Sequence, residues 1–441
     1  MSFRLRRRVR DETRCGWLAT VGPEVPDPPA PPLEGTVKAD YVVIGAGFTG
    51  LAAAARLAEL RPQDSILLLD AVPLGAGPAG RSSGFVVDLA YFIAEMPAAI
   101  GDAFVDLSRF GIDQLRRRVE EHQLPCQWDE SGWVHVAGTD AGERQMKRLA
   151  SWLEGRGERF QALGSEAMRE LCGSSYYRGG LRLPGSVLVQ PAALVRSLAS
   201  ALPSNVRLAT GDAVRAIHPG SAVRLETSRA SIEAPQVVLA VNSLLPNLGV
   251  LRQRVFPLHT FGSFTRPLTA EEADAIGGAK EWGLLAQDPM GSSVRRTRED
   301  RILIRNLAHF DRRPTAPQRM QRRAVASHRR ALIRRFPELA EVAFEHSWDG
   351  LLGMTGNHRH FFGAIDVGLW ATGGYFGAGI VMGTVSGHLL AEEIAGNGAE
   401  THRLSLLRTI IGPQWLPPTP VLDWGVSLRV KQLTWSVDDQ V

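Results

Sequence analysis

Cysteine is scarce in this 441-residue sequence, which contains only Cys15, Cys126 and Cys172. Their wide spacing excludes a CxxC redox pair and a cysteine-based zinc cluster, and so sparse a set is typical of a reducing compartment. The basic N-terminus also lacks the apolar segment of a secretory signal. We therefore expect a cytoplasmic protein without a metal site.

Long apolar runs are absent as well. No stretch of about 18–20 residues is free of charges and glycine breaks, so no membrane-spanning helix is expected. The formal net charge is only +4, and the densest basic segments are Arg4–Arg10 and Arg312–Arg335. Neither belongs to a nucleic-acid-binding motif, so we interpret the second as a solvated helix face and expect no nucleic-acid partner.

Proline and glycine, in contrast, are clustered. Six prolines between residues 23 and 32 disfavour helix and sheet. Residues 1–35 are therefore expected to form an extended arm that either lies along the surface or is partly disordered. The glycines, 45 in all, concentrate at residues 45–50, 75–84 and 373–383, and each of these segments adjoins a predicted strand or helix.

The first glycine segment is a GxGxxG motif. It lies between a predicted strand at Tyr41–Ile44 and a predicted helix at Leu51–Leu60. Its first glycine permits a tight turn, its second lets the backbone approach a pyrophosphate, and its third lets the helix pack closely on the strand. The next predicted strand, Ser65–Asp70, ends in an acid that can accept hydrogen bonds from ribose hydroxyls. These features predict a dinucleotide at the helix N-terminus.

The second glycine segment, GAGPAGRSSG at residues 75–84, adds backbone N–H groups and two hydroxyls beside that ligand. It suits the flavin side of FAD better than a nicotinamide. Only the GxGxxG motif at residues 45–50 lies between a predicted strand and a predicted helix. A second domain for NAD(P)H is therefore not expected, and the electrons must come from the substrate. A third cluster follows a predicted strand at Leu369–Thr372 and precedes a predicted helix at Val385–Ala395.

In this order the segments resemble the D-amino-acid oxidase/glycine oxidase/sarcosine oxidase (DAO) superfamily of FAD enzymes, and within it the gamma-glutamylputrescine oxidase-like branch. The likeness rests on ADYVVIGAGFTGLAAAARLAE, GAGPAGRSSG, VLVQPAALVRSLASAL and the C-terminal segment Gly350–Ile394. It implies an α/β fold in which a Rossmann-type FAD-binding domain is interleaved with a mixed-sheet α+β substrate domain. The expected division is an arm at 1–35, the FAD-binding domain at 36–110, 185–245 and 345–400, the substrate domain at 111–184 and 246–344, and a C-terminal tail at 401–441.

The resemblance also assigns residues to FAD binding, and it implies oxidation of a C–N bond by hydride transfer to flavin N5. The matching positions are Gly45, Gly47, Phe48, Thr49, Gly50, Asp70, Ala71, Gly80, Arg81, Ser82, Ser83, Gly84, Val214, Ala240, Asn242, Gly373, Gly374, Gly377, Ala378, Gly379 and Ile380.

Two departures from the family bear on the substrate. Amino-acid oxidases hold the substrate carboxylate with an arginine where this chain has Leu352, and sarcosine oxidases use a basic residue where it has Ile380 and Val381. Because a bidentate arginine is the natural carboxylate partner, its absence favours a small amine without an α-carboxylate. No cysteine lies near Leu352–Met354, where some relatives attach the flavin, so the FAD is expected to be non-covalent.

The sequence gives weaker evidence for catalytic residues than for FAD-binding residues. His259 lies where the chain crosses to the substrate domain, Tyr375 lies in the third glycine cluster, and Arg359 lies in the polar run 357–360. A structural role is an open alternative for each of them. Asp88 follows the second glycine segment, and a carboxylate there would hold a cationic amine.

Three functions therefore stay open. The first is an FAD-dependent amine oxidase that reduces oxygen. The second is a dehydrogenase that passes electrons to a quinone or a partner protein, with the basic arm and the tail tryptophans Trp415, Trp424 and Trp435 mediating docking or membrane contact. The third is a flavin-binding subunit of a larger oxidase.

Overall fold

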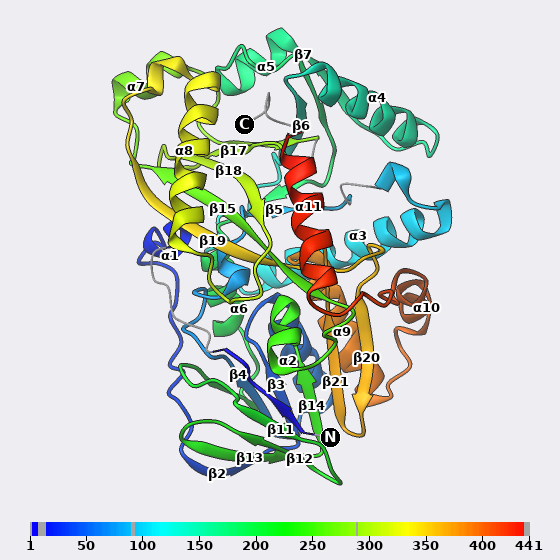
Figure 1. Ribbon diagram of the computed structural model, residues 1–441. Helices are drawn as coiled ribbons and strands as arrows, with labels where there is room; N and C mark the ends of the chain where they lie inside the picture. The colour runs from blue at the N-terminus through cyan, green and yellow to red at the C-terminus, as the bar shows by residue number, and fades with distance from the viewer. Residues whose placement is uncertain (1, 8–14, 90–92, 288–289, 436–441) are drawn as a thin grey trace.

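A computed structural model describes residues 2–7, 15–89, 93–287 and 290–435. Three sheets dominate it (Figure 1). A six-stranded sheet and a five-stranded sheet lie in the half of the molecule that holds the N-terminal strands, and an eight-stranded sheet forms the other half. None of the helices in the described part is both long and apolar enough to cross a membrane.

The six-stranded sheet is parallel except at one edge. Its strands, in spatial order, are β10 (Val206–Ala209), β4 (Ile66–Leu69), β3 (Tyr41–Ile44), β14 (Gln236–Leu239), β21 (Leu369–Gly373) and β20 (Phe361–Asp366). Only β20 runs antiparallel to its neighbour. The central strands are almost wholly apolar because both faces of the sheet are covered. The carboxyl ends of the parallel strands therefore meet at one edge.

Helices α2 (Phe48–Leu60) and α9 (Val381–Ala395) pack closely together on this sheet. The predicted start of the second helix, Val385, is wrong by four residues, because the helix begins at Val381. Its glycines serve packing rather than a turn. A Cβ at Gly387 would lie 2.1 Å from the carbonyl oxygen of Thr49, and one at Gly383 would lie 2.8 Å from the Thr49 hydroxyl.

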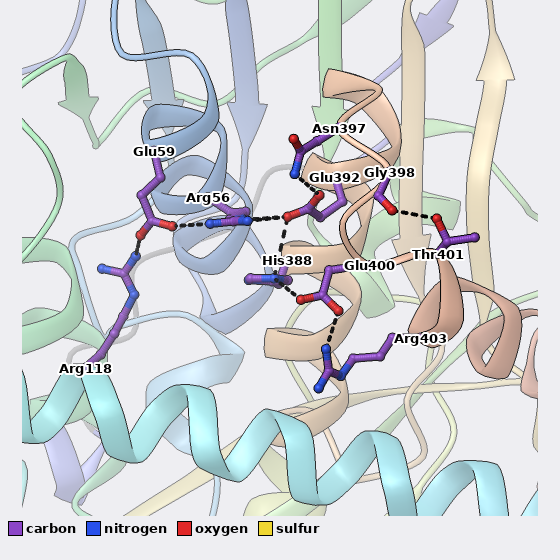
Figure 2. Close-up of polar contacts among 10 residues, drawn as sticks. All are labelled: Arg56, Glu59, Arg118, His388, Glu392, Asn397, Gly398, Glu400, Thr401 and Arg403. Atoms are coloured by element: carbon purple, nitrogen blue, oxygen red, sulfur yellow. Dashed lines mark hydrogen bonds and ion pairs between the residues drawn. The ribbon is translucent and has the colours of Figure 1, made fainter.

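A polar cluster secures the same two helices at their far ends (Figure 2). The Arg56 guanidinium on α2 donates from Nε to the buried carboxylate of Glu392 on α9, at 2.7 Å. Arg56 also pairs with Glu59, which pairs in turn with Arg118 on α3 (Ala98–Glu121). Asn397 donates to the other Glu392 oxygen at 3.0 Å. A buried carboxylate is tolerated because it is fully hydrogen-bonded.

The five-stranded sheet packs on the opposite face of the six-stranded sheet through a shared apolar cluster. Its strands, in spatial order, are β1 (Phe3–Arg4), β11 (Ala216–His218), β12 (Val223–Glu226), β13 (Ala230–Ala234) and β2 (Gly35–Lys38). The first belongs to the predicted N-terminal arm at 1–35, and the last begins at the final residue of that arm. Residues 8–10 of its basic run and the side chain of Trp435 lie outside the described part.

The eight-stranded sheet is mixed, as the family resemblance implies. Its strands, in spatial order, are β19 (Phe344–Met354), β15 (Phe256–Thr265), β18 (Ile302–His309), β17 (Ser293–Arg296), β16 (Trp282–Ala286), β6 (Trp133–Ala137), β8 (Gly179–Arg182) and β7 (Gln161–Gly164). The helices around it are α4 (Asp140–Glu154), α5 (Ser165–Cys172), α7 (Ala270–Ile276) and α8 (Gln318–Arg335). As predicted for that basic segment, α8 buries Ala324, Ala331 and Leu332 and exposes most of its arginines.

The remaining elements connect these layers. They are α1 (Gly16–Ala19), the pair β5 (Phe85–Val86) and β9 (Val187–Leu188), α6 (Pro191–Ser200), α10 (Thr401–Ile410) and α11 (Val421–Trp435). Two expected domain boundaries fall inside elements. Residue 110 lies within α3, which packs on α9, and residue 345 lies within β19, whose strand partner β15 belongs to the eight-stranded sheet.

The N-terminal arm is not confined to the surface, which corrects the sequence-based expectation. Trp17 on α1 is 1% exposed and packs edge-on against Phe264 with ring centroids 4.6 Å apart. The Arg295 guanidinium lies 5.1 Å from the Trp17 ring centroid, and Gln190 Nε2 donates to the Trp17 carbonyl at 2.6 Å. The proline-rich segment therefore connects α1 to β2. Burial of the Trp17 side chain holds the arm against the rest of the protein.

Replacing Trp17 with alanine should lower the free energy of unfolding by about 3–5 kcal/mol, because a fully buried indole leaves a cavity. Chemical denaturation followed by circular dichroism measures the change. Trp424, whose side chain is 74% exposed, supplies the matched control, and its alanine variant should differ from the wild type by less than about 0.5 kcal/mol. Equal stability of the Trp17→Ala variant and the wild type would contradict the role given to the arm.

Candidate active site

A cavity of about 1020 Å³ opens at the carboxyl edge of the six-stranded sheet and extends to the eight-stranded sheet. Most of the residues predicted to bind FAD line it: Gly45, Gly47, Phe48, Thr49, Asp70, Ala71, Gly80, Arg81, Ser82, Ser83, Val214, Ala240, Asn242, Gly377, Gly379 and Ile380. The others, which lie behind this wall, are Gly50, Gly84, Gly373, Gly374 and Ala378. Ligands of open α/β sheets bind at this edge.

The GxGxxG loop forms the first wall. Gly45 has a φ of 107°, and a Cβ there would lie 2.8 Å from the Ala240 carbonyl oxygen at the end of β14. A Cβ at Gly50 would lie 1.7 Å from the Gly45 carbonyl oxygen, so only glycine lets α2 pack this closely on β3. Gly47 is the N-cap of α2, so the amino end of the helix faces the cavity with its partial positive charge.

Asp70 follows β4 and fixes the neighbouring loops. Its Oδ2 accepts the Ala46 N–H at 2.8 Å, and its Oδ1 accepts the Val72 N–H at 3.1 Å. Burial raises the pKa of this carboxyl, and the N–H groups of Ala46, Val72 and Ala71 counteract that rise. The carboxylate therefore stands at the cavity with both oxygens oriented and with lone pairs left for a ligand.

The second glycine segment is held from within. A Cβ at Gly80 would lie 2.1 Å from the Gly75 carbonyl oxygen. The Arg81 guanidinium donates to the Ala76 carbonyl at 2.7 Å and to the Asp349 carbonyl on β19 at 3.2 Å. Trp348 Nε1 donates back to the Arg81 carbonyl at 3.1 Å. Arg81 therefore joins the two halves of the cavity wall rather than standing free for a phosphate.

Comparison with known proteins decides the family. A family model for FAD-dependent oxidoreductases, named DAO, matches residues 40–393. The chain belongs to the DAO family of FAD-dependent oxidoreductases. The probable oxidoreductase OrdL of Rhizobium meliloti is 28% identical over 405 residues, which cover 89% of this chain and 91% of that protein. Gamma-glutamylputrescine oxidoreductase of Escherichia coli is 24% identical over 379 residues, which cover 83% of this chain and 85% of that protein.

Structural comparison shows the same fold. Glycine oxidase from Geobacillus kaustophilus superposes with a TM-score of 0.68 at 20% identity, covering 82% of this chain and 95% of that chain. The likeness confirms a Rossmann-type FAD-binding part joined to a mixed-sheet part, as the resemblance implied.

The cavity of this DAO-family chain fits FAD. Four buried hydroxyls on its wall have no hydrogen-bond partner within the described residues, namely those of Ser82, Ser243, Ser293 and Thr355. Buried polar atoms are normally paired, so these hydroxyls are groups that a bound polar ligand would satisfy. The glycine cradles, Asp70 and the amino end of α2 are the groups expected to hold the adenosine ribose and pyrophosphate. No group of three or more His, Cys, Asp or Glu in the described ranges could hold a metal.

Asn242 has a supporting position at the cavity. It has a φ of 42°, and its Oδ1 accepts the Gly374 N–H at 2.8 Å. A Cβ at Gly353 would lie 2.3 Å from the same oxygen. The Asn242 side chain thus holds the turn after β21 against the end of β19. Gly373 and Gly374 contact this side chain or its backbone and do not line the cavity.

The three predicted catalytic residues do not converge. His259 is fully buried in β15, where Nδ1 bonds to Asp349 Oδ2 at 2.7 Å and Nε2 to the Arg313 carbonyl at 3.0 Å. Its neighbours Leu258 and Thr260 line the cavity instead, because successive residues of a strand face opposite sides. The His259 position therefore favours a structural role. Arg359 is half-buried and also lies away from the cavity wall.

Tyr375 does line the cavity. Its hydroxyl accepts from the Thr49 hydroxyl at 3.2 Å and donates to the Thr372 hydroxyl at 3.1 Å, and burial raises its pKa. These bonds join β21 to the first turn of α2, so Tyr375 helps to position the wall of the cavity.

The sequence did not point to the wall that lies opposite the FAD loops. It is formed by Phe256, Leu258 and Thr260 on β15, by Arg305 and Leu307 on β18, and by Leu422, Val426 and Val430 on α11. For β15 and β18, the alternation of side chains between the two faces of a strand could have indicated which residues face the cavity. Nothing in the sequence connected the tail to the cavity.

Replacing Asp70 with asparagine should weaken FAD binding about 10- to 100-fold, because a charged hydrogen-bond acceptor is replaced by a group that also carries donors. Titration of the apoprotein with FAD, followed by quenching of flavin fluorescence, measures the dissociation constant. Asp366, an exposed carboxylate on β20, provides the control, because its asparagine variant should bind FAD like the wild type. Unchanged affinity in the Asp70 variant would refute the assignment.

Asp88 follows β5 but does not line the cavity, so it is not placed to hold a substrate amine. It is 3% exposed, and burial raises the pKa of its carboxyl from 3.8 to about 6. Because the folded pKa lies above the unfolded one, folding takes up a proton between about pH 4 and pH 6, and stability falls as the pH rises through this window.

Asp88→Asn should therefore stabilise the apoprotein at about pH 7 by on the order of 2–3 kcal/mol and change it little at about pH 4. Urea unfolding at a series of pH values measures both effects. A variant that is destabilised at neutral pH would show that the carboxylate is paired in its ionised form.

Proposed function

We propose that this chain oxidises the C–N bond of a small amine with FAD and passes the electrons to oxygen. The observation that carries the proposal is Leu352, which lines the cavity where amino-acid oxidases of the family have an arginine. The relative from Escherichia coli is named for an amine, gamma-glutamylputrescine. An apolar wall at this position favours a substrate without an α-carboxylate.

FAD and the protein side chains contribute different parts of the proposed reaction. When bound, FAD supplies a two-electron acceptor that takes a hydride from the carbon next to the amine nitrogen. Leu258, Leu352 and Met354 provide an apolar surface in the cavity, which would keep water from a bound substrate and disfavour a charged ammonium group. The neutral amine is the reactive form, so this surface helps by favouring deprotonation. The imine product then reacts with water to give an aldehyde or ketone and the released amine or ammonia.

The FAD is proposed to be non-covalent, since none of the three cysteines is among the cavity residues. All three are buried free thiols, which supports a reducing cytoplasm as the compartment.

A dehydrogenase that delivers electrons to a quinone or a partner protein is the second candidate. Trp415, Trp424 and Leu428 are 55%, 74% and 69% exposed. Exposed apolar side chains of this size are typical of contact surfaces, and Trp424 and Leu428 lie on the helix that covers the cavity.

The purified protein should be yellow, and acid denaturation should release free FAD into the supernatant. An amine panel should bleach the flavin anaerobically and yield one hydrogen peroxide per amine oxidised in air. Turnover with a quinone or dye but not with oxygen would select the dehydrogenase. A colourless protein that cannot be reconstituted with FAD, or a preference for α-amino acids over amines, would refute the proposal.

A further inference from the structure

Helix α11 lies outside the residues that the family model matches, which end at 393. In Figure 1 it stands in front of the eight-stranded sheet, and it contacts β18. An ion pair joins it to the loop that follows β18, because the Arg312 guanidinium donates to Asp423 Oδ1 from Nε at 2.9 Å and from Nη2 at 2.7 Å. The helix is therefore a fixed part of the described structure.

The two faces of α11 differ in position, although both are apolar. One face lines the cavity with Leu422, Val426, Val430 and Leu433. The other carries Trp424 and Leu428, which are mostly exposed. Residues four apart share a helix face, so Val426 and Val430 stand together on the cavity side, and Trp424 and Leu428 stand together away from it.

The inner face of α11 continues the wall at Leu352. Val426 and Val430 pack on the same apolar cluster as Leu352, Met354 and Phe256. The place where amino-acid oxidases bind a carboxylate is therefore one side of an apolar pocket whose other side is α11. Arg429 is also on the wall, but it is exposed and donates to Gln432 at 3.0 Å.

We propose that the inner face of α11 binds the apolar part of the substrate, which is an amine that carries an alkyl or aryl group of several carbons. This inference rests on the proposed amine oxidation, and it adds the substrate class and the residues that select it. Burial of each methylene against such a wall should raise kcat/KM about threefold to fourfold. The ion pair between Arg312 and Asp423 is the positioning contact that holds this wall in place.

A series of unbranched primary amines from ethylamine to octylamine tests the pocket in the FAD-loaded enzyme. In the wild type, log kcat/KM should rise steadily with chain length. The double variant Val426→Ser/Val430→Ser should lose most of that slope while retaining its FAD content, measured from the flavin absorbance. Asp423→Asn should raise KM for octylamine more than for ethylamine.

Leu428→Ser supplies the matched control, because it makes the same kind of change on the same helix but on the exposed face. It should keep the wild-type slope. Equal slopes in the inner-face and outer-face variants would overturn the inference. A preference for amines with a terminal carboxylate would also overturn it, because the cavity arginines Arg305 and Arg429 would then select the substrate.

Binding of the same amines, measured anaerobically from the perturbation of flavin absorbance, separates the two proposals. If no amine reduces the flavin but affinity still rises with chain length in the wild type and not in the inner-face variant, the proposed oxidation fails and the pocket stands. If amines reduce the flavin and neither affinity nor kcat/KM depends on chain length, the oxidation stands and the pocket fails.

Discussion

The close contact between α2 and α9 is the constraint on which the FAD site depends. Each helix begins at a glycine-rich segment of the cavity wall, one after β3 and the other after β21. Their axes can approach because Gly387 leaves room for the Thr49 carbonyl, and the buried Arg56–Glu392 pair secures the contact at the other end. A side chain at residue 387 would separate the helices and, with them, two segments that must face one ligand.

This constraint explains which parts of the fold were predictable. The strand β3 has the predicted bounds, and the GxGxxG loop follows from backbone requirements that only glycine meets. The start of α9 was missed because Gly383 resembles a turn glycine in the sequence, although Gly383 and Gly387 both serve helix packing. Their role is set by Thr49, which is more than 300 residues away in the chain, and no local pattern contains that information.

The same limit applies to side chains whose chemistry suggested function. His259 is an attractive catalytic group by type, but the register of β15 turns it toward Asp349 and turns Leu258 and Thr260 toward the cavity. The N-terminal arm is similar, since Trp17 is buried only because Phe264 and Arg295 are placed to receive it. The residue type correctly indicated a polar contact for His259 and an apolar contact for Trp17. The role of each contact depends on the partner residue, which the sequence pattern does not identify.

The two walls of the cavity are therefore determined by different kinds of sequence information. The wall predicted to bind FAD consists largely of backbone, where close contacts exclude any residue larger than glycine at several positions. Such a requirement can be recognised as a sequence motif. The opposite wall consists of side chains from β15, β18, β19 and α11. Because α11 lies beyond the segment that the family model matches, substrate selection can differ in this chain while cofactor binding stays the same. An apolar residue at 352 favours burial of a ligand only where a second apolar surface covers it, and Val426 and Val430 on α11 provide that surface.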